Sequence, residues 1–269
     1  MVVKTMSVKV IQNISPWHTY PSCTWEVLRR IESYKNLYKS LDLQGFETIS
    51  LGRSASCIVS HNYYPEFEKY GLLFPADPEL SAVNAPVFWH PNRFQNVVRF
   101  LVIPEDKIDP NGLTINISEF PAHRTHFKAP DGAHHIRFLG EKFWFQLRCA
   151  DLNLVDENVY IGIEIDRVND LEKRLKTVTQ IAGIYDGSID ISAPLHTPKR
   201  PDLHESSTRV YDIRAAGGTW KDAINAHFGE EYLNNNPDEF QSARTTVRNN
   251  YTRVESFICG EFLKILDQT

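Results

Sequence analysis

A row of polar side chains near the carboxyl end of the chain has the residue types that recognise nucleic acid. Arginine, glutamine and asparagine can form paired hydrogen bonds with base edges, and arginine and threonine can donate to phosphate oxygens. The members of the row recur every three or four residues, a spacing that places them on one face of an α-helix. The chemistry that they predict is binding of double-stranded DNA, and they are Gln241, Arg244, Thr245, Arg248, Asn249 and Thr252.

An apolar row beside it predicts the helix that carries these side chains. Pro237, Asp238 and Glu239 suit its first turn, because proline is tolerated there and acids complement the positive end of the helix dipole. The apolar spacing continues for about seven turns, so we expect one long helix from about Asp238 to Leu266. Its first half would enter the major groove, and its second half, from Val254, would attach it to the rest of the protein or to another subunit. The apolar residues are Phe240, Ala243, Val247, Tyr251, Val254, Ile258, Phe262 and Ile265.

Two shorter helices are expected just before the long one. Thr219 can cap a helix over Trp220–Phe228, which Gly229 can end in the left-handed conformation open to glycine. The pair Gly217-Gly218 separates it from a helix over Arg209–Ala216. This order of helices is typical of a helix-turn-helix, although a helical bundle that does not bind DNA has the same pattern. In the first interpretation the phosphate backbone would be held by the start of the short helix, at Thr219, Trp220 and Lys221.

The distribution of charge is compatible with such a face. The chain has a formal net charge of −5. Residues 1–40 hold six basic and two acidic side chains, a net charge of +4, whereas residues 205–269 hold seven basic and ten acidic ones, a net charge of −3. The acids of the second segment lie mainly at helix starts and in 230–239 rather than beside Arg244 and Arg248, so a local basic face is possible there.

The amino-terminal region predicts a helix and a proline-rich block. Ser22 can start a helix that runs to about Leu41 with its apolar residues on one face. Residues 42–64 have no firm period and are expected to form a surface loop, and Pro65–Tyr70 could form a helical turn that Gly71 ends. Three prolines interrupt regular structure in 72–89, so the large apolar residues there indicate an extended segment that packs closely against another element.

From residue 97 the apolar pattern changes to a period of two, which is typical of β-strands. We expect a mostly antiparallel sheet of four or five strands, then a helix from Asn169 or Asp170, and a linker or loop over Tyr185–Ser207. The predicted fold class is α+β: an N-terminal helix and antiparallel sheet form a platform for the C-terminal helix-turn-helix-like unit. The expected strands are 97–103, 113–120, 134–138, 143–147 and 160–165. The expected regions are 1–92 (the N-terminal region), 93–184 (the sheet and a helix), 185–207 (the linker) and 208–269 (the helical DNA-binding unit).

Metal binding and catalysis find less support in the sequence. Four of the ten histidines, His123, His126, His134 and His135, lie close together in sequence, but zinc needs three or four converging ligands. His134 and His135 would point to opposite faces of a strand because they are neighbours. The chain has no nucleophile elbow, phosphate-binding loop or dinucleotide-binding glycine motif. We therefore expect no enzymatic activity, no metal and no cofactor.

The composition predicts a cytoplasmic protein without a membrane partner. No apolar run approaches the about 20 residues of a membrane span, and Met1–Ile14 lacks the apolar core of a signal peptide. The cysteines are scattered and have no metal-ligand spacing, which suits a reducing compartment. They are Cys23, Cys57, Cys149 and Cys259.

Three segments of the chain, taken in order, resemble a known family. They are Trp25–Arg30 (WEVLRR), Tyr70–Pro78 with Ala85–Trp89 (YGLLFPADP and APVFW), and Arg209–Gly229 (RVYDIRAAGGTWKDAINAHFG). The chain is similar to a family of proteobacterial transcriptional-regulator-like proteins, and its carboxyl part resembles the DNA-binding domain of RovC-type activators of type VI secretion genes. Similar proteins are common on integrative and conjugative elements. The resemblance covers most of the chain, from about Trp17 to Leu266, and its proline-rich block is the most specific part.

The resemblance implies a DNA-binding transcriptional regulator that acts as a homo-oligomer and has no cofactor. By position, the opening of the family's short helix corresponds to residues 219–221, and its arginine-rich helix corresponds to the long helix from about Asp238. That helix is more basic in the family, because threonines and asparagines such as Thr245 and Asn249 stand between the arginines here. We therefore expect weaker phosphate binding, unless oligomerisation or the basic N-terminal helix compensates. The corresponding arginines are Arg244, Arg248 and Arg253.

Two other functions are compatible with the sequence. The helices could bind another protein, which would make the chain a scaffold or adaptor of a mobile element. The histidine-rich sheet could instead bind a metal or a small molecule, which would make the chain a sensor. The first alternative predicts a large exposed apolar patch on the long helix, and the second predicts bound metal in the purified protein.

Overall fold

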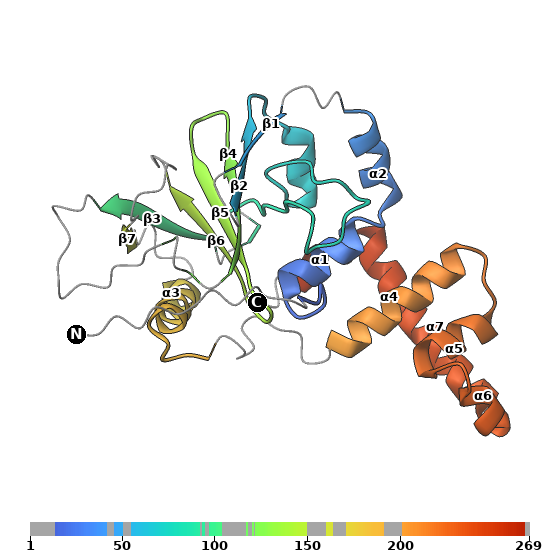
Figure 1. Cartoon of the computed structure of the whole chain (residues 1–269). Coiled ribbons are helices and arrows are strands. Elements are labelled where there is room, and N and C mark those ends of the chain that lie inside the picture. The colour runs from blue at the N-terminus through green and yellow to red at the C-terminus, as the bar shows by residue number, and fades with distance from the viewer. Residues whose placement is uncertain are drawn as a thin grey trace.

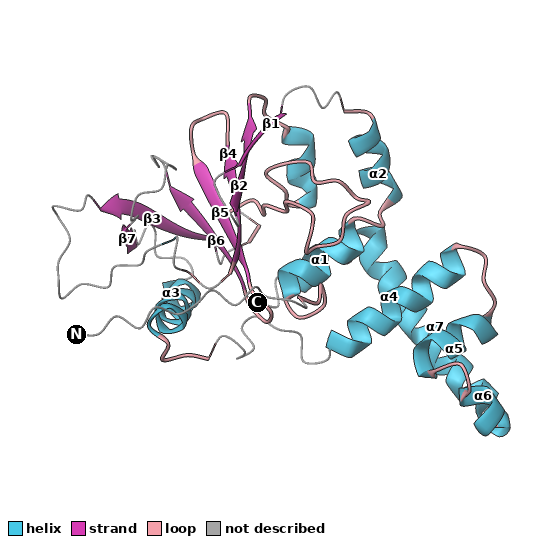
Figure 2. Cartoon of the chain, viewed as in Figure 1, coloured by secondary structure: helices cyan, strands magenta, loops and turns pink. Residues whose placement is uncertain are grey.

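The computed structural model describes residues 14–41, 46–50, 55–91, 93–94, 97–103, 117, 120, 122–149, 160–163, 171–190 and 201–266. Its β-strands form one mixed sheet, helices and an irregular segment pack on that sheet, and a helical unit projects from one side (Figures 1 and 2). The expected α+β class is confirmed. Within the described part of the chain, no helix is both long enough and apolar enough to span a membrane.

Among the described residues, seven strands form the sheet in the order β1-β2-β4-β5-β6-β3-β7. The pairs β2–β4 and β3–β6 are parallel, and the other four neighbouring pairs are antiparallel. The register between β5 and β6 places Phe138 opposite Phe145, so large apolar side chains meet on one face. The strands are β1 (Phe46–Ser50), β2 (Ala55–Ser60), β3 (Val97–Ile103), β4 (His123–Lys128), β5 (His134–Leu139), β6 (Trp144–Cys149) and β7 (Tyr160–Ile163).

The sheet is larger and more mixed than the sequence predicts. The surface loop expected over 42–64 is wrong, because this segment contributes β1 and β2, which join the sheet through the parallel β2–β4 pair. Strand β4 was also not predicted, since it is rich in polar and charged residues and its three consecutive buried residues show no alternation. The strand expected over 113–120 falls almost entirely outside the described residues; Ile117 and Phe120, which are described, do not lie in a strand.

One face of the sheet is covered by α3 (Leu171–Asp186). Ile181 and Ile184 of this helix share a buried cluster with Ile136 and Phe138 of β5. The expected helix from residue 169 or 170 is thereby confirmed. Burial of these four side chains joins α3 to the sheet through the hydrophobic effect.

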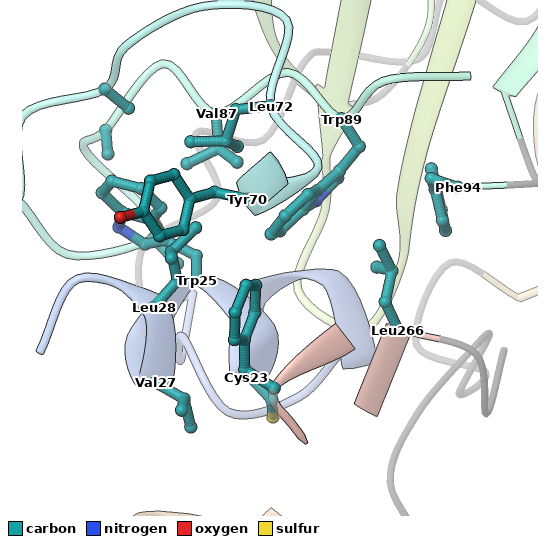
Figure 3. Close-up of a cluster of buried hydrophobic side chains, with 14 of the residues drawn as sticks. Cys23, Trp25, Val27, Leu28, Tyr70, Leu72, Val87, Trp89, Phe94 and Leu266 are labelled. Atoms are coloured by element: carbon teal, nitrogen blue, oxygen red, sulfur yellow. The ribbon is translucent and has the colours of Figure 1, made fainter. Parts of the chain in front are cut away.

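The opposite face is covered by α1 (Tyr20–Leu28), by the short 3-10 helix η2 (Pro65–Tyr70) and by the proline-rich segment that follows. The indole of Trp25 donates to the carbonyl of Leu80 at 3.1 Å, and Tyr34 Oη donates to the carbonyl of Ala76 at 2.6 Å. Figure 3 shows Trp25, Trp89 and Leu266 converging in this cluster although they lie far apart in sequence. The prediction that the proline-rich segment packs closely is confirmed.

The buried side chain of Arg137, on β5, connects the proline-rich segment to the sheet through hydrogen bonds. The side chain is fully buried, and its guanidinium donates to the carbonyls of Ala82 and Ala85 and to Thr125 Oγ1 at 3.1 Å. Burial lowers the pKa of this guanidinium to about 10. It stays charged at neutral pH, and the backbone carbonyls provide the hydrogen bonds that a buried cation needs.

The single helix expected over 22–41 is wrong, because the chain turns between α1 and α2 (Glu32–Lys39). Ile31 is in an extended conformation at the turn, and its side chain is buried in the cluster beneath α1. Residues Pro21–Leu28 are all buried, so packing on every side, rather than one apolar stripe, sets the path of α1. The apolar spacing across 22–41 did not reveal this change of direction.

The C-terminal unit contains α4 (Pro201–Ala215), α5 (Trp220–Phe228), α6 (Tyr232–Asn235), the 3-10 turn Pro237–Glu239 and α7 (Phe240–Ser256). The bounds of α5 match the prediction. Helix α4 begins eight residues earlier than expected, within the expected linker 185–207, whose residues 185–186 belong to α3. Proline is favourable in the first turn of a helix, and Pro201 is at that position in α4.

The long helix expected to reach Leu266 is interrupted. A π-helical turn, Phe257–Glu261, follows α7, and Gly260 has a φ of 129°, which L-residues rarely adopt. The chain then forms α8 (Leu263–Leu266), in which Ile265 and Leu266 are buried in the same cluster as Trp25. The prediction that the second half attaches the unit to the platform is confirmed, although a separate short helix makes the attachment.

Candidate nucleic-acid interface

Helices α4, α5 and α7 share a small core of their own. Val210 of α4, Ile224 of α5 and Val247 of α7 are each fully buried in one cluster. Ala223 and Ala243 complete its centre, and their small side chains allow the helices to approach closely. This core determines which face of α7 points inward and therefore which face is left to solvent.

The outward face of α7 carries the polar row identified in the sequence. Ala243 and Val247 are buried, whereas all five predicted base-contacting residues are exposed. The Thr245 hydroxyl donates to the carbonyl of Gln241 at 2.9 Å and can still accept a hydrogen bond. The exposed residues are Gln241, Arg244, Thr245, Arg248 and Asn249.

The two arginines of this face are available to an external partner. No acidic residue occurs from Phe240 to Val254. Within the described part of the chain, neither Arg244 nor Arg248 has an ion pair or a hydrogen bond from its side chain. The nearest acids in sequence are Glu239, which accepts a hydrogen bond from the Tyr232 hydroxyl, and Glu255. A positive band thus occupies the middle of α7 and is bounded by an acid at each end.

At the start of α5, Thr219 is engaged within the protein. Its hydroxyl accepts from the backbone N–H of Asp222 at 3.2 Å, and its own N–H donates to Asp222 Oδ2 at 2.7 Å. Hydrogen bonds from the side chain and the backbone of Thr219 lower the pKa of the Asp222 carboxyl. A phosphate would have to compete with this carboxylate at the helix N-terminus, so the capping box weakens the expected phosphate contact of Thr219.

Trp220 and Lys221 differ in their surroundings. The Trp220 ring is half-buried, its centroid lies 6.1 Å from that of Tyr251, and the guanidinium of Arg214 stacks over it at 4.4 Å. The indole therefore joins α4, α5 and α7, with a cation–π contact on one face. Lys221 is exposed and can reach an external phosphate.

The structure brings the two groups of predicted residues together only in part. Trp220 meets α7 at Tyr251, less than one turn beyond Arg248, so the start of α5 lies beside that end of the polar row. Gln241 lies seven residues before Arg248, which corresponds to about 10 Å along the helix. Lys221 and Arg248 can thus contact one stretch of a phosphate backbone, whereas Gln241 and Arg244 lie farther from α5.

The histidines of the sheet do not form a metal centre among the described residues. His135 pairs with Phe127 across β4 and β5, and His134 pairs with Cys149 across β5 and β6. The expectation that His134 and His135 point to opposite faces follows from their alternation along β5. Burial lowers the pKa of both His126 and His135 to about 3, so both imidazoles are neutral at physiological pH.

Sequence reasoning missed one group of polar residues. A cavity is lined by Glu68 of η2, by His90 of the proline-rich segment, and by His135 and Arg148 of the sheet. These residues are 80 positions apart at the extremes, and no spacing along the chain connects them. Only the packing of η2 on the sheet brings them to one place.

Comparison of the sequence with protein-family models gives no match, and comparison with curated proteins gives no significant match. A function for this chain therefore rests on the geometry of its exposed groups. In the described part of the chain, the outward face of α7 and the cavity beside the sheet both present polar groups that a partner could contact.

Proposed function

We propose that this chain is a DNA-binding transcriptional regulator that uses the outward face of α7 to contact double-stranded DNA. The observation that carries the proposal is the acid-free face with two exposed arginines that lack a partner in the described residues. Exposed arginines among amides and hydroxyls are the side chains that contact phosphates and base edges in protein–DNA interfaces. The resemblance to RovC-type activators supports the same function.

The proposed geometry places the first half of α7 in the major groove. The groove is about 12 Å wide and admits one α-helix. Arg244 and Arg248 can each donate two hydrogen bonds to a guanine edge, and Gln241 or Asn249 can pair with an adenine edge. Figure 1 shows that α7 extends away from the sheet toward α6, so the platform lies beyond the carboxyl end of α7. The platform would then leave the groove accessible to the first half of the helix.

The small number of cations limits the affinity of one protomer. If Lys221 at the phosphate backbone and the two arginines in the groove each displace one counterion from the DNA, the logarithm of the affinity falls with the logarithm of salt at a slope of about −2.7. Raising salt from about 50 to 200 mM would then weaken binding about 40-fold. Two protomers on one DNA double the slope, so we propose that the protein binds as a homo-oligomer in the cytoplasm.

A fluorescence-anisotropy titration of the full chain with mixed genomic DNA duplexes at these two salt concentrations tests the proposal. We expect saturable binding at low salt and a loss of at least about 40-fold at high salt. Absence of binding at low salt would contradict the proposal. The helical unit would then be better explained as a surface for another protein.

A further inference from the structure

A cavity of about 260 Å³ lies between the sheet and the segment that contains η2. Phe127 of β4, with His135 and Arg148, forms the sheet side, and Tyr64 and Glu68 lie on the other side. The volume is slightly below the range of about 300–1,000 Å³ that is usual for sites of drug-sized ligands. A molecule of amino-acid size suits it better.

One residue that lines the cavity, His135, has a buried polar atom without a hydrogen-bond partner in the described part of the chain. His135 is 2% exposed, and its Nδ1 makes no hydrogen bond. The ring stays neutral because burial lowers its pKa to about 3. His135 therefore adds no charge to the cavity.

A cation and an acid that line the cavity have hydrogen-bonding capacity left within the described residues. Arg148 is half-buried, and its Nη2 forms a long ion pair with Asp131 Oδ2 at 3.9 Å, beyond hydrogen-bond distance. Its five N–H donors therefore remain available to an anion. The exposed carboxylate of Glu68 makes no hydrogen bond or ion pair with any described residue, and its electrostatic effect on His90 shows that it lies near that histidine.

We propose that this cavity binds a small zwitterion with an apolar side chain, the chemistry of an apolar α-amino acid. The ligand carboxylate pairs with Arg148, because a planar guanidinium can donate two parallel hydrogen bonds to it. The ammonium pairs with Glu68. The apolar side chain packs against Phe127 and Leu73.

The charges distinguish this ligand from simpler ones. A plain carboxylate would satisfy Arg148 but would be repelled by Glu68 and Asp131, which both line the cavity. A plain amine would satisfy an acid but leave Arg148 without an anion. A zwitterion can contact Arg148 and Glu68 together, and the long ion pair of Arg148 with Asp131 leaves hydrogen-bond donors of the guanidinium for the ligand carboxylate. The proposal concerns the platform and does not depend on DNA binding.

Isothermal calorimetry with the full chain tests the proposal without DNA. The probes are L-valine, L-leucine, L-methionine and L-phenylalanine. Two further probes, 4-methylpentanoate and 3-methylbutylamine, keep the leucine frame but lack its ammonium or its carboxylate. We expect at least one amino acid to bind at one molecule per chain and both truncated probes to bind at least tenfold more weakly. Binding of no amino acid, or equal binding of a truncated probe, would overturn the proposal.

Substitutions test which residues bind the carboxylate and the ammonium of the ligand. Arg148→Met should weaken binding of the best amino acid at least tenfold, and Arg209→Met, which changes an exposed arginine on α4, should leave it unchanged. Glu68→Gln provides a second test at an exposed position whose change should not affect folding. It should weaken amino-acid binding while leaving binding of 4-methylpentanoate unchanged or stronger. Wild-type affinity in Glu68→Gln, or in a folded Arg148→Met, would overturn the assignment.

Discussion

Arg30 donates two hydrogen bonds to Asp212, from Nε to Oδ1 at 2.7 Å and from Nη2 to Oδ2 at 2.9 Å. Arg30 lies at the turn between α1 and α2, and Asp212 lies on α4, so this bidentate pair joins the platform to the helical unit. The same guanidinium contacts Glu26 Oε2 at 3.1 Å. A buried carboxylate on α1 thus holds the arginine that reaches the helical unit.

The two carboxylates of this network should differ greatly in their contribution to stability. Asp212 is 46% exposed, so Asp212→Ala should lower the free energy of unfolding by at most about 1 kcal/mol. Glu26 is 2% exposed and also accepts from the N–H of Ala82 at 2.8 Å and from Arg29 Nε at 2.6 Å. Its loss leaves buried donors unpaired, so Glu26→Ala should cost about 3–5 kcal/mol. Urea unfolding of both variants measures the difference, and equal costs would contradict this account of Glu26.

Capping residues and apolar periodicity predicted the helical unit well, because both depend only on residues close together in sequence. The capping box of Thr219 and Asp222 fixes the start of α5, and the alternation of Ala243 and Val247 with polar residues identifies the inward face of α7. The breaks at Ile31 and Gly260 have another origin. In both places the chain turns, and residues distant in sequence pack with Trp25 in one cluster. The residues beside each break show no sequence pattern that indicates these long-range contacts.

The inward and outward faces of α7 should respond differently to the same substitution. Val254 is 4% exposed, and Thr252, two residues away, is exposed. Val254→Asp places a carboxylate in an apolar contact without a counter-charge and should cost at least about 3 kcal/mol. Thr252→Asp should change stability by less than about 0.5 kcal/mol. Thermal or urea unfolding compares the two, and a stable Val254→Asp protein would show that this side of α7 is not buried.

Acid should destabilise the protein through its buried histidines. His126 and His135 have a pKa of about 3 in the folded protein, against 6.5 for an unperturbed imidazole. The unfolded chain therefore binds more protons between these values, and stability is fully present above pH 6.5 and is lost as the pH falls toward 3. Each histidine should contribute a slope of up to about 1.4 kcal/mol per pH unit in this window.

Substitution of His126 tests this origin of the pH dependence. Urea unfolding from pH 4 to pH 6 should show a shallower slope for His126→Gln than for the wild type, because one difference in proton uptake is removed. His61→Gln changes an exposed imidazole and should leave the slope unchanged. An unchanged slope for His126→Gln would mean that other groups cause the acid sensitivity.

The candidate sites were predictable to different degrees. The row from Gln241 to Asn249 lies on one helix, so its periodicity was sufficient to predict a shared face. The contact of Trp220 with Tyr251, and the use of Thr219 by Asp222, depend on how helices pack and were visible only in the structure. The cavity at His135 combines segments far apart in sequence, which no local pattern can indicate.

The most direct measurement of the central claim compares DNA binding of the double variant Arg244→Ala/Arg248→Ala with that of Arg209→Ala. Arg209 is an exposed arginine on α4 that pairs with Glu205 at 3.0 Å, so its variant changes net charge without touching α7. We expect the double variant to bind at least about tenfold more weakly, with a shallower salt dependence, and Arg209→Ala to bind as the wild type does. Equal DNA affinity of the double variant and the wild type, with both proteins folded, would contradict the claim that α7 contacts DNA.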